Sequence, residues 1–412
     1  MEKESKVCNI RPADRIEKVG EYYFSKKLKE VAGMIAAGKR VISLGVGGPD
    51  RQPTGWAIDA FCDALQKPDV HGYQPYNGIP ELRKWFAKWY EQWYGITLDP
   101  KTEILPLIGS KEGIFHISLA FLNPGDGVLV PNPGYPTYTS VSRLVGADLV
   151  SYQLDEKNGW YPDFDELERI LAERQQSGKP AVKLMWVNYP NMPTGADATD
   201  ELFDRLVAFG MANQLIICND NPYSSILNDH PRSILSSPGA KEICIELNSM
   251  SKSHNMPGWR VGMLASNPQF VQWVLKVKSN VDSGQLKPLQ LAAVTALKTK
   301  RYWFTLMNEQ YRERRIIAEQ IMDSLGCTYD KKQVGLFLWG KIPDHIESSE
   351  WLTDKILYDA HVFIVPGSVF GSAGERYIRI SLCCPDEKFA IALNRIKKLN
   401  IKMLHATSLQ KT

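Results

Sequence analysis

The sequence predicts an α/β protein, with a large domain built on a mostly parallel central sheet flanked by helices and a smaller α+β domain after it. Three observations lead to this fold class. Short apolar runs recur along the chain, and amphipathic segments separate them. The pattern of predicted helices and strands changes after about residue 285. Apolar runs of this length between helical segments are typical of strands that helices cover on both faces.

The regular alternation begins at about residue 104. Residues 109–122 predict a helix that is entered through Gly109 and Ser110, and residues 125–131 predict a short buried strand. The elements expected next, in chain order, are a strand at 182–188, a helix at 201–213, and strands at 215–220, 242–248 and 260–266.

The second half of the chain has a different pattern. Two long helical stretches are followed by shorter strands, with helices between and after them, and this mixture predicts a smaller α+β domain. The helices are expected at 288–300 and 302–325, and the strands at 335–340, 361–366 and 377–383. Residues 22–38 predict a further helix near the N-terminus. We therefore expect an N-terminal segment (1–50) that packs with the small domain, a large domain (51–287) and a small C-terminal domain (288–412).

Composition excludes several classes of protein. The net charge is only +3 and the basic residues are scattered, which argues against nucleic acid as a partner. No run of about 18 apolar residues is present, so no membrane span is expected. The N-terminus has no apolar stretch typical of a secretion signal, and the seven cysteines form no CxxC pair. We expect a cytoplasmic protein with reduced thiols and no metal site.

Polar residues follow the ends of the predicted strands and precede the first helix. In open α/β sheets, ligands bind at the carboxyl ends of the strands, so residues far apart in the sequence meet at one edge. Candidates of this kind are Ser110, Lys111, Asn191, Asp220, Tyr223, Ser249, Ser251 and Lys252.

The chemical types in this set belong together. A helix N-terminus after Gly-Ser offers backbone amides to a phosphate, and Ser249 and Arg260 add a hydroxyl and a fixed positive charge. A carboxylate such as Asp220 can hold a ring nitrogen protonated, and Tyr223 can donate to a ring oxygen. Lys252 is enclosed by small and apolar neighbours, which favour the neutral, nucleophilic amine. Phosphate, protonated pyridine, phenolic oxygen and an imine-forming lysine together describe pyridoxal phosphate.

Each of these residues also has an ordinary structural explanation. Most lysines are solvated, and an aspartate after a strand often caps a turn or a helix. Arg260 can be a salt-bridge residue and Tyr223 a packing aromatic. The ordered set in one plausible geometry, rather than any single member, indicates the cofactor.

The stretch SMSKSHNMPGWRVG (249–262) resembles, position by position, the lysine signature of the class I/II aminotransferases, which are pyridoxal-phosphate enzymes of fold type I. Within that family the branch of aspartate, alanine and LL-diaminopimelate aminotransferases is the most similar. Further segments resemble the family in its order: LGVGGPD (44–50), YQPYNGIPELR (73–83), GSKEGI (109–114), PNPGYPTY (131–138), NMPTG (191–195), DNPYSSI (220–226) and YIRIS (377–381).

The resemblance implies roles around the cofactor. Lys252 would form the internal aldimine, Asp220 would pair with the pyridine nitrogen, and Tyr223 would face the 3′ oxygen. Tyr135 would stack on the ring. The phosphate would be bound by Ser110, Lys111, Ser249 and Arg260.

The resemblance also implies a homodimer whose two active sites are shared. Tyr73 would reach the phosphate of the neighbouring subunit. Arg379 would bind the substrate α-carboxylate through two parallel hydrogen bonds, with help from the backbone near Val46 and Gly47.

One position departs from the family pattern. The family has asparagine directly before Pro-Thr-Gly, where its amide meets the 3′ oxygen of the cofactor. This chain has Met192 there, preceded by Asn191. Either Asn191 replaces the missing amide, or the site lacks one hydrogen bond to the cofactor.

We therefore predict an aminotransferase that moves an amino group between an amino acid and a 2-oxo acid, with Lys252 as the base at the substrate Cα. The alternative on the same fold is a carbon–sulfur lyase. A cofactor-binding regulatory protein is disfavoured because the chain has no appended DNA-binding segment. A dicarboxylate substrate would need a second cation, from Arg51, Lys287 or the partner subunit, and the sequence does not choose among them.

Overall fold

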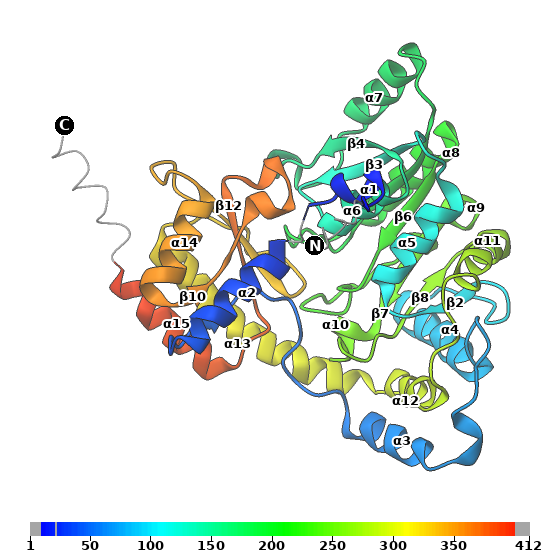
Figure 1. Ribbon diagram of the computed structural model, residues 1–412, viewed down its shortest axis with the longest axis horizontal. Coiled ribbons are helices and arrows are strands. Elements are labelled where there is room, and N and C mark those ends of the chain that lie inside the picture. The colour runs from blue at the N-terminus through cyan, green and yellow to red at the C-terminus, as the bar shows by residue number, and fades with distance from the viewer. Residues whose placement is uncertain (1–9, 21–22, 400–412) are drawn as a thin grey trace, which may run out of the picture.

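The computed structural model describes residues 10–20 and 23–399, so the parts of the N- and C-terminal predictions that fall on 1–9, 21–22 and 400–412 lie outside the described residues. Two units lie side by side (Figure 1). The larger contains a seven-stranded mixed sheet flanked by helices, and the smaller contains a three-stranded sheet with its own helices. The predicted α/β fold with a smaller α+β part is confirmed.

The large sheet has the strand order β2-β8-β7-β6-β5-β3-β4. Strand β8 runs antiparallel to both of its neighbours, and the other adjacent pairs are parallel. The strands are β2 (Ile104–Leu107), β3 (Gly127–Asn132), β4 (Asp148–Gln153), β5 (Val182–Val187), β6 (Ile216–Asp220), β7 (Cys244–Ser249) and β8 (Gly262–Ala265). The strand predicted at 260–266 is antiparallel because it returns directly from β7, without the crossover helix that a parallel neighbour requires.

The edge strands β2 and β4 are absent from the sequence prediction. Strand β4 has a mixed sequence, DLVSYQ, and most of its residues are only partly buried. Strand β2 is four residues long and contains a proline. Strand β4 therefore lacks the continuous apolar run of the central strands, whereas β2 is apolar and buried but is short and interrupted by a proline.

Strand β5 shows why the central strands are apolar on both sides. Leu184 and Trp186 belong to one buried cluster, with residues of α5, α6 and α11, whereas Met185 and Val187 belong to the other, with residues of α7 and α8. Successive side chains of a strand point to opposite faces, so both faces of this sheet are covered. The helices of the large unit are α3 (Gly55–Leu65), α4 (Pro80–Tyr94), α5 (Ser110–Phe121), α6 (Pro136–Leu144), α7 (Phe164–Gln176), α8 (Asp200–Asn213), α9 (Ala240–Ile243), α10 (Met250–Ser253), α11 (Pro268–Lys278) and α12 (Lys287–Leu297).

The smaller unit contains an antiparallel sheet of order β11-β12-β9. Its elements are α13 (Arg301–Leu325), β9 (Phe337–Lys341), α14 (Ser349–Ala360), β10 (Val362–Phe363), β11 (Val365–Pro366), β12 (Tyr377–Ser381) and α15 (Asp386–Lys398). The single strand predicted at 361–366 is wrong, because its first half pairs with β1 (Ile42–Ser43) and its second half pairs with β12. Short 3-10 helices complete the described chain: η1 (Pro68–Val70), η2 (Glu156–Asn158), η3 (Ile234–Ser236), η4 (Gly367–Phe370) and η5 (Ser372–Gly374).

Helix α13 joins the two units as one continuous element (Figure 1). Near its start, Phe304 packs against Trp89 and Trp93 of α4, with ring centroids 5.4 and 5.1 Å apart. Its later turns pack against α15 and β9. Helix α12, in contrast, packs against α3 and α4. We therefore propose that the smaller unit begins at α13 rather than at residue 288.

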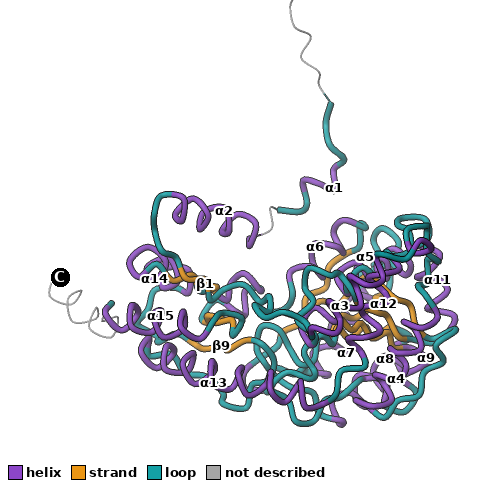
Figure 2. Tube along the Cα trace, turned by 90° about the horizontal axis from the view of Figure 1, so that it is seen from below, coloured by secondary structure: helices purple, strands orange, loops and turns teal. Residues whose placement is uncertain are grey.

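The N-terminal segment reaches both units. Helix α1 (Asp14–Glu17) packs against α6, and α2 (Tyr23–Ala36) lies over the smaller unit beside α14 (Figure 2). Lys27 Nζ lies 2.7 Å from Asp354 Oδ1 of α14, and Tyr358 of the same helix donates a hydrogen bond to Glu30. The segment thus passes from the large unit to the small one.

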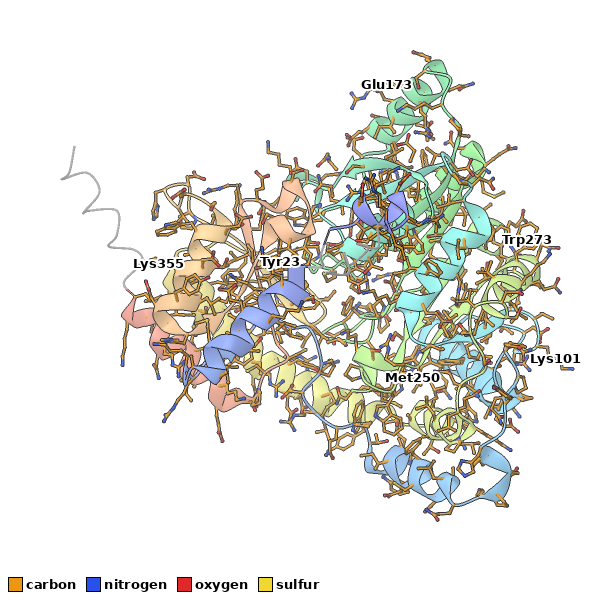
Figure 3. The ribbon with its side chains drawn as sticks, in the orientation of Figure 1. Tyr23, Lys101, Glu173, Met250, Trp273 and Lys355 are labelled. Carbon is orange, nitrogen blue, oxygen red and sulfur yellow. The ribbon has the colours of Figure 1, made fainter. Side chains whose placement is uncertain are left out.

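Within the described chain, every helix is too short or too polar to cross a membrane. Figure 3 shows where the lysine signature lies: Met250, at the start of α10, is toward the middle of the view, whereas Lys101 and Trp273 lie at the outer edge. The described cysteines, Cys62, Cys218, Cys244, Cys327, Cys383 and Cys384, are free thiols.

Candidate active site

A cavity of about 520 Å³ lies where the carboxyl ends of the large sheet face the smaller unit. Residues from α2, the loop after β1, α5, α6, α10, β9 and β12 line it. Most of the residues predicted from the sequence come together there: Val46, Gly47, Ser110, Lys111, Tyr135, Asp220, Tyr223, Ser249, Lys252, Arg260 and Arg379. Tyr73 and Asn191 do not line the cavity.

Lys252 lies on α10, a single helical turn directly after β7. The turn begins at Ser249, whose hydroxyl accepts a hydrogen bond from the backbone N–H of Ser251. The ammonium group of Lys252 donates to the carbonyl of Gly47. Burial lowers the pKa of Lys252, and the nearby positive charges of Arg379 and Arg260 act in the same direction. The site therefore favours the neutral amine, which is the form that acts as a nucleophile or base.

Asp220 is the last residue of β6 and is buried. Tyr138 donates a hydrogen bond to Asp220 Oδ2 at 3.0 Å, and the Tyr138 ring stacks on Trp186 at 5.1 Å. Among the described residues, Asp220 Oδ1 has no hydrogen-bond partner. Burial raises the pKa of Asp220 to about 7, and the Tyr138 hydrogen bond works against this rise. A buried carboxylate oxygen without a partner fits the protonated ring nitrogen of pyridoxal phosphate, which would satisfy both its hydrogen bond and its charge.

This carboxylate makes the stability of the cofactor-free protein depend on pH. The pKa of Asp220 is about 7 in the folded chain, compared with an ordinary value of 3.8. Between these values the folded state keeps a proton that the unfolded state has lost, so stability falls as the pH rises through this window. We expect the free energy of unfolding of the Asp220→Asn variant to rise relative to that of the wild type by about 1.4 kcal/mol per pH unit from pH 4 to 7. Above pH 7 the difference between the two proteins should stay constant.

Urea unfolding of both cofactor-free proteins at a series of pH values from 4.5 to 8 measures this difference. The comparison isolates one group, because asparagine preserves the size of the side chain. Unfolding free energies that run parallel over the whole range would contradict the raised pKa.

The start of α5 forms a concentrated positive site. Ser110 and Lys111 lie in its first turn, preceded by Gly109 in a left-handed conformation (φ 77°). Arg260 reaches this turn and donates to the carbonyl of Ile108 at 3.3 Å. Partial burial and the charge of Arg260 lower the pKa of Lys111. Two cations and the free amides of a helix N-terminus fit a phosphate dianion.

Ser251 also belongs to this site, although the sequence analysis does not assign it a role. Its hydroxyl lies 3.0 Å from the hydroxyl of Ser249 and 3.4 Å from Arg260 Nη1. It lines the cavity between Ser249 and Lys252. The sequence does contain a signal for Ser251, because the signature stretch places two serines, two residues apart, directly before the lysine.

Gly109 leaves the space that Arg260 occupies. A Cβ at position 109 would lie 2.1 Å from Arg260 Nη2. We expect the Gly109→Ala variant to displace Arg260 and to weaken cofactor affinity by about 10- to 100-fold, from the clash and the unfavourable φ together. Fluorescence titration of the cofactor-free protein with pyridoxal phosphate measures this change.

Gly146 provides a matched control. It has a similar φ of 82°, but a Cβ there would meet nothing closer than 3.4 Å. The Gly146→Ala variant also places alanine at a positive φ but without the clash, so its cofactor affinity is expected to stay within a few-fold of the wild type. Equal losses in the two variants would show that strain alone, and not the position of Arg260, sets the affinity.

The two predicted tyrosines border the cavity. Tyr135 immediately precedes α6 and packs edge to face on Tyr138, with ring centroids 5.6 Å apart. Tyr223 is buried, and burial raises the pKa of its phenol well above the ordinary value. Tyr223 therefore keeps its proton at neutral pH and is a hydrogen-bond donor toward the cavity.

Asn191, the residue that could replace the missing family asparagine, does not line the cavity. Its Oδ1 accepts hydrogen bonds from the backbone N–H and the hydroxyl of Thr194, at 3.2 and 2.8 Å, which hold the side chain inside its own turn. The residues of this segment that line the cavity are Met192 and Asn188. Asn188 accepts from the Met192 N–H at 2.7 Å and donates to the carbonyl of Asp220. The Oδ1 atom of Asn191 is thus held within its own turn, whereas its Nδ2 is buried and has no hydrogen-bond partner among the described residues.

Arg379 lies on β12 and is buried. Its Nη2 donates to the carbonyl of Gly45 at 2.8 Å, which ties it to the loop that contains Val46 and Gly47. Its guanidinium carbon lies 4.0 Å from the ring centroid of Phe337 and 4.6 Å from that of Phe370. The aromatic rings fix the plane of the fork, and a fixed guanidinium fork is suited to a carboxylate.

Outside the cavity, one acidic cluster resembles a metal site in composition. Glu112, His116 and Asp282 bring their ligand atoms within 4.8 Å of one another. Lys278 Nζ lies 2.8 Å from Glu112 and 2.6 Å from Asp282, so an ammonium already provides the cation. Glu112 also accepts a hydrogen bond from the backbone N–H of Ile108. The cluster thus anchors the turn that precedes the phosphate site.

A lysine amine, a partnerless carboxylate oxygen and a cationic helix start around one cavity define a pyridoxal-phosphate enzyme. The chain belongs to the family of class I and II aminotransferases, whose family model matches residues 39–396. It is 38% identical to the LL-diaminopimelate aminotransferase of Aquifex aeolicus over 391 residues, which are 94% of this chain and 99% of that protein. It is also 38% identical to the LL-diaminopimelate aminotransferase of Oleidesulfovibrio alaskensis over 390 residues, 94% of this chain and 98% of the relative.

Solved structures of aminotransferases share the fold. Substrate-bound BacF from Bacillus subtilis is 34% identical, with a TM-score of 0.89 over 95% of this chain and 98% of that one. The aromatic aminotransferase from Pyrococcus horikoshii is 30% identical, with a TM-score of 0.81 over 90% and 98% of the two chains.

The protein is a pyridoxal-phosphate-dependent aminotransferase of fold type I, a transferase of class EC 2.6.1, whose substrates are amino acids and 2-oxo acids. These matches support amino-group transfer and give no support to the carbon–sulfur lyase considered from the sequence.

Proposed function

We propose that the cavity is the site of amino-group transfer and that Lys252, Asp220 and Arg379 have the central roles. The observation that carries this proposal is that all three side chains line one cavity, together with the cationic start of α5. Pyridoxal phosphate, when bound, supplies an electron-withdrawing ring that accepts the charge left when an amino acid loses its Cα proton.

The residues divide the work by charge and position. Arg379 and the backbone near Val46 and Gly47 hold the substrate carboxylate. Lys252 Nζ takes the Cα proton as a neutral amine and returns it to the cofactor side. Asp220 Oδ1 would accept the ring N–H and keep that nitrogen protonated, so that the positively charged ring can accept electrons.

The remaining residues position the ring. Tyr223 donates its O–H toward the ring oxygen, and Tyr135 covers one ring face and excludes water from it. Four groups hold the phosphate, namely Ser110, Lys111, Ser249 and Arg260. Met192 has a thioether where the family has an amide, and a thioether cannot donate a hydrogen bond. We therefore assign Tyr223 as the donor to the ring oxygen.

Incubation with a ¹⁵N-labelled amino donor and an unlabelled 2-oxo acid tests the reaction. Amino-group transfer yields one labelled amino acid and one new 2-oxo acid, and mass spectrometry detects both. The names of the curated relatives make LL-diaminopimelate one donor to include, with glutamate as a second. Release of ammonia without any labelled amino acid would contradict the proposal.

We also propose a homodimer in which Tyr73 completes the phosphate site of the partner. Tyr73 is 96% exposed and lies outside its own cavity, and the nearby Tyr76 and Leu286 are exposed apolar residues as well. An interface of this kind places the same surface of two subunits in contact. The exposed phenol supports a role on another chain, because no cavity residue of its own subunit surrounds it.

Hybrid dimers of the Tyr73→Ala and Lys252→Ala chains separate action across subunits from action within one. If Tyr73 acts across the dimer, one site of each hybrid has both residues, so a hybrid should show about half the activity of a wild-type dimer. Co-expression with two affinity tags isolates the hybrid. A hybrid with no more activity than the Tyr73→Ala homodimer would place Tyr73 in its own subunit's chemistry, or in none.

A further inference from the structure

The charged groups of the cavity are all assigned once the cofactor and one carboxylate are bound. Among the described residues, the cations that line it are Lys111, Lys252, Arg260 and Arg379, and the carboxylate is Asp220. Lys111 and Arg260 face the phosphate, and Lys252 and Asp220 face the reacting centre. Arg379 takes the α-carboxylate.

The two cations of this chain that the sequence suggests, Lys287 and Arg51, do not add to this set. Lys287 pairs with Asp69 at 2.9 Å, and Arg51 lies 3.9 Å from Asp386. Neither is among the described residues that line the cavity. The described chain thus offers a distal carboxylate no second cation, and a distal ammonium no second anion.

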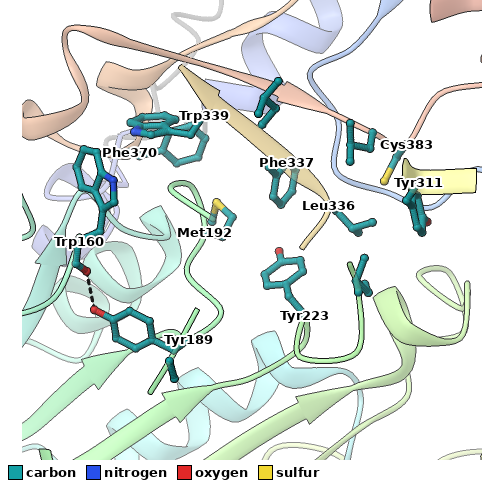
Figure 4. Packing of buried hydrophobic residues seen from close by; sticks show 14 of the residues in the cluster. Trp160, Tyr189, Met192, Tyr223, Tyr311, Leu336, Phe337, Trp339, Phe370 and Cys383 are labelled. Carbon is teal, nitrogen blue, oxygen red and sulfur yellow. Dashed lines mark hydrogen bonds between the residues drawn. The ribbon is translucent and has the colours of Figure 1, made fainter. Parts of the chain in front are cut away.

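The rest of the cavity wall near Arg379 is apolar. We call it the apolar wall, and it consists of Phe24, Leu28, Met192, Phe337 and Phe370. Figure 4 shows Met192, Phe337 and Phe370 gathered on one side of Tyr223. The Phe337 ring meets the Tyr223 ring at 5.7 Å, edge to face.

The wall begins at the group that binds the carboxylate. The guanidinium of Arg379 lies 4.0, 4.6 and 5.6 Å from the ring centroids of Phe337, Phe370 and Phe24. Its Nη1 lies 3.1 Å from the sulfur of Met192. The carboxylate and the side chain of an amino acid leave the same carbon, so the substrate side chain must start within a few ångströms of these groups.

Helix α2 supplies the outer part of the wall. Phe24 and Leu28 are four residues apart and therefore lie on one face of the helix. Leu28 is 38% exposed, which places it at the mouth, whereas Phe337 and Phe370 are buried. Ion-pair and hydrogen-bond contacts of Lys27 and Glu30 to α14 hold this helix over the smaller unit.

We propose that this aminotransferase selects amino donors with a large apolar or aromatic side chain, and that Phe24 and Leu28 of α2 close the side-chain pocket. The inference rests on the proposed function, since it assigns Arg379 to the α-carboxylate. An aromatic side chain gains from burial against these rings, whereas a distal charge loses its water without finding a partner.

Donor specificity is the first test. With one 2-oxo acid acceptor, kcat/KM for phenylalanine is expected to exceed the values for glutamate and for LL-diaminopimelate by at least about 100-fold. Equal or higher values for either charged donor would overturn the inference and leave the proposed function intact. Absence of transfer from every donor would count against the proposed function instead.

A binding measurement tests the wall without turnover. Calorimetry compares 3-phenylpropionate with glutarate as ligands of the cofactor-loaded protein, since both have one carboxylate for Arg379 and differ in the far end. We expect 3-phenylpropionate to bind at least about 10-fold more tightly. Tighter binding of glutarate would overturn the inference even if no donor reacts.

The Leu28→Arg variant tests the contribution of α2. Leu28 is partly exposed, so the substitution is compatible with folding, and it places a cation in the wall. We expect kcat/KM for phenylalanine to fall by about 10- to 100-fold, mainly through KM, and that for glutamate to rise. The Ile35→Arg variant, on the same helix but 52% exposed and away from the cavity, is expected to change neither. If Leu28→Arg behaves like Ile35→Arg, α2 does not contribute to specificity.

Discussion

Replacement of Lys252 by alanine is expected to lower kcat for amino-group transfer by at least about 10⁴-fold, because it removes both the nucleophilic amine and the base. The cavity lowers the pKa of Lys252, mainly through burial, which shifts its equilibrium toward the neutral amine. The large loss should appear in the chemical step, since Lys252 lines the cavity, and the melting temperature shows separately that the variant is folded. Steady-state kinetics and thermal unfolding of the same preparations measure the two quantities.

Two companion variants make this result specific. Lys252→Arg preserves the positive charge but cannot give a neutral amine, so it should be as inactive as the alanine variant. Lys101→Ala removes an exposed lysine at the outer edge of the molecule and should leave kcat unchanged (Figure 3). Substantial activity in Lys252→Arg would mean that the lysine acts only through its charge.

Replacement of Arg379 by alanine is expected to lower kcat/KM by about 10³-fold, mostly through KM. The buried guanidinium, held by the Gly45 carbonyl and the rings of Phe337 and Phe370, would otherwise meet the substrate carboxylate. Arg379→Lys should lose about 10²-fold, because an ammonium cannot offer the fork of two parallel donors. Initial rates over a range of amino donor concentrations separate the changes in KM and kcat.

Arg312→Ala is a suitable control, since Arg312 is an exposed arginine that lies 3.5 Å from Asp229. Its removal should have no effect on either constant. A kcat/KM for Arg379→Ala within 10-fold of the wild type would show that another group binds the carboxylate, and would also remove the geometric basis for the apolar wall.

The central strands could be predicted from the sequence because both of their faces are buried, so that nearly every residue in them is apolar. In β5, Leu184 and Trp186 face one cluster and Met185 and Val187 the other, so the run is apolar without interruption. Edge strand β4 has no such constraint and reads as a polar segment. The split of 361–366 into β10 and β11 depends on pairing with β1, which is more than 300 residues away in the chain. The local sequence pattern cannot indicate such a distant pairing.

The cavity likewise contains residues that local sequence could identify and residues whose place depends on distant packing. Asp220 and Lys252 could be found because Asp220 ends one buried strand and Lys252 lies in the turn after another, and strand ends converge by topology. Phe24 and Leu28 could not, because their place depends on where α2 packs. The place of Asn191, one residue before the Met192 that precedes Pro-Thr-Gly, makes it one alternative for the missing amide, and only the structure shows that Thr194 holds its Oδ1 in the local turn.

Helix α13 has a mechanical consequence. It is 25 residues long, and its first turns are packed on α4 of the large unit while its last turns are packed on α15. A continuous helix that is packed at both ends can transmit a tilt or a rotation from one end to the other, but it resists stretching. Any tilt of this helix would therefore be passed to the part of the smaller unit that packs on it, which includes β9 with Phe337 of the apolar wall.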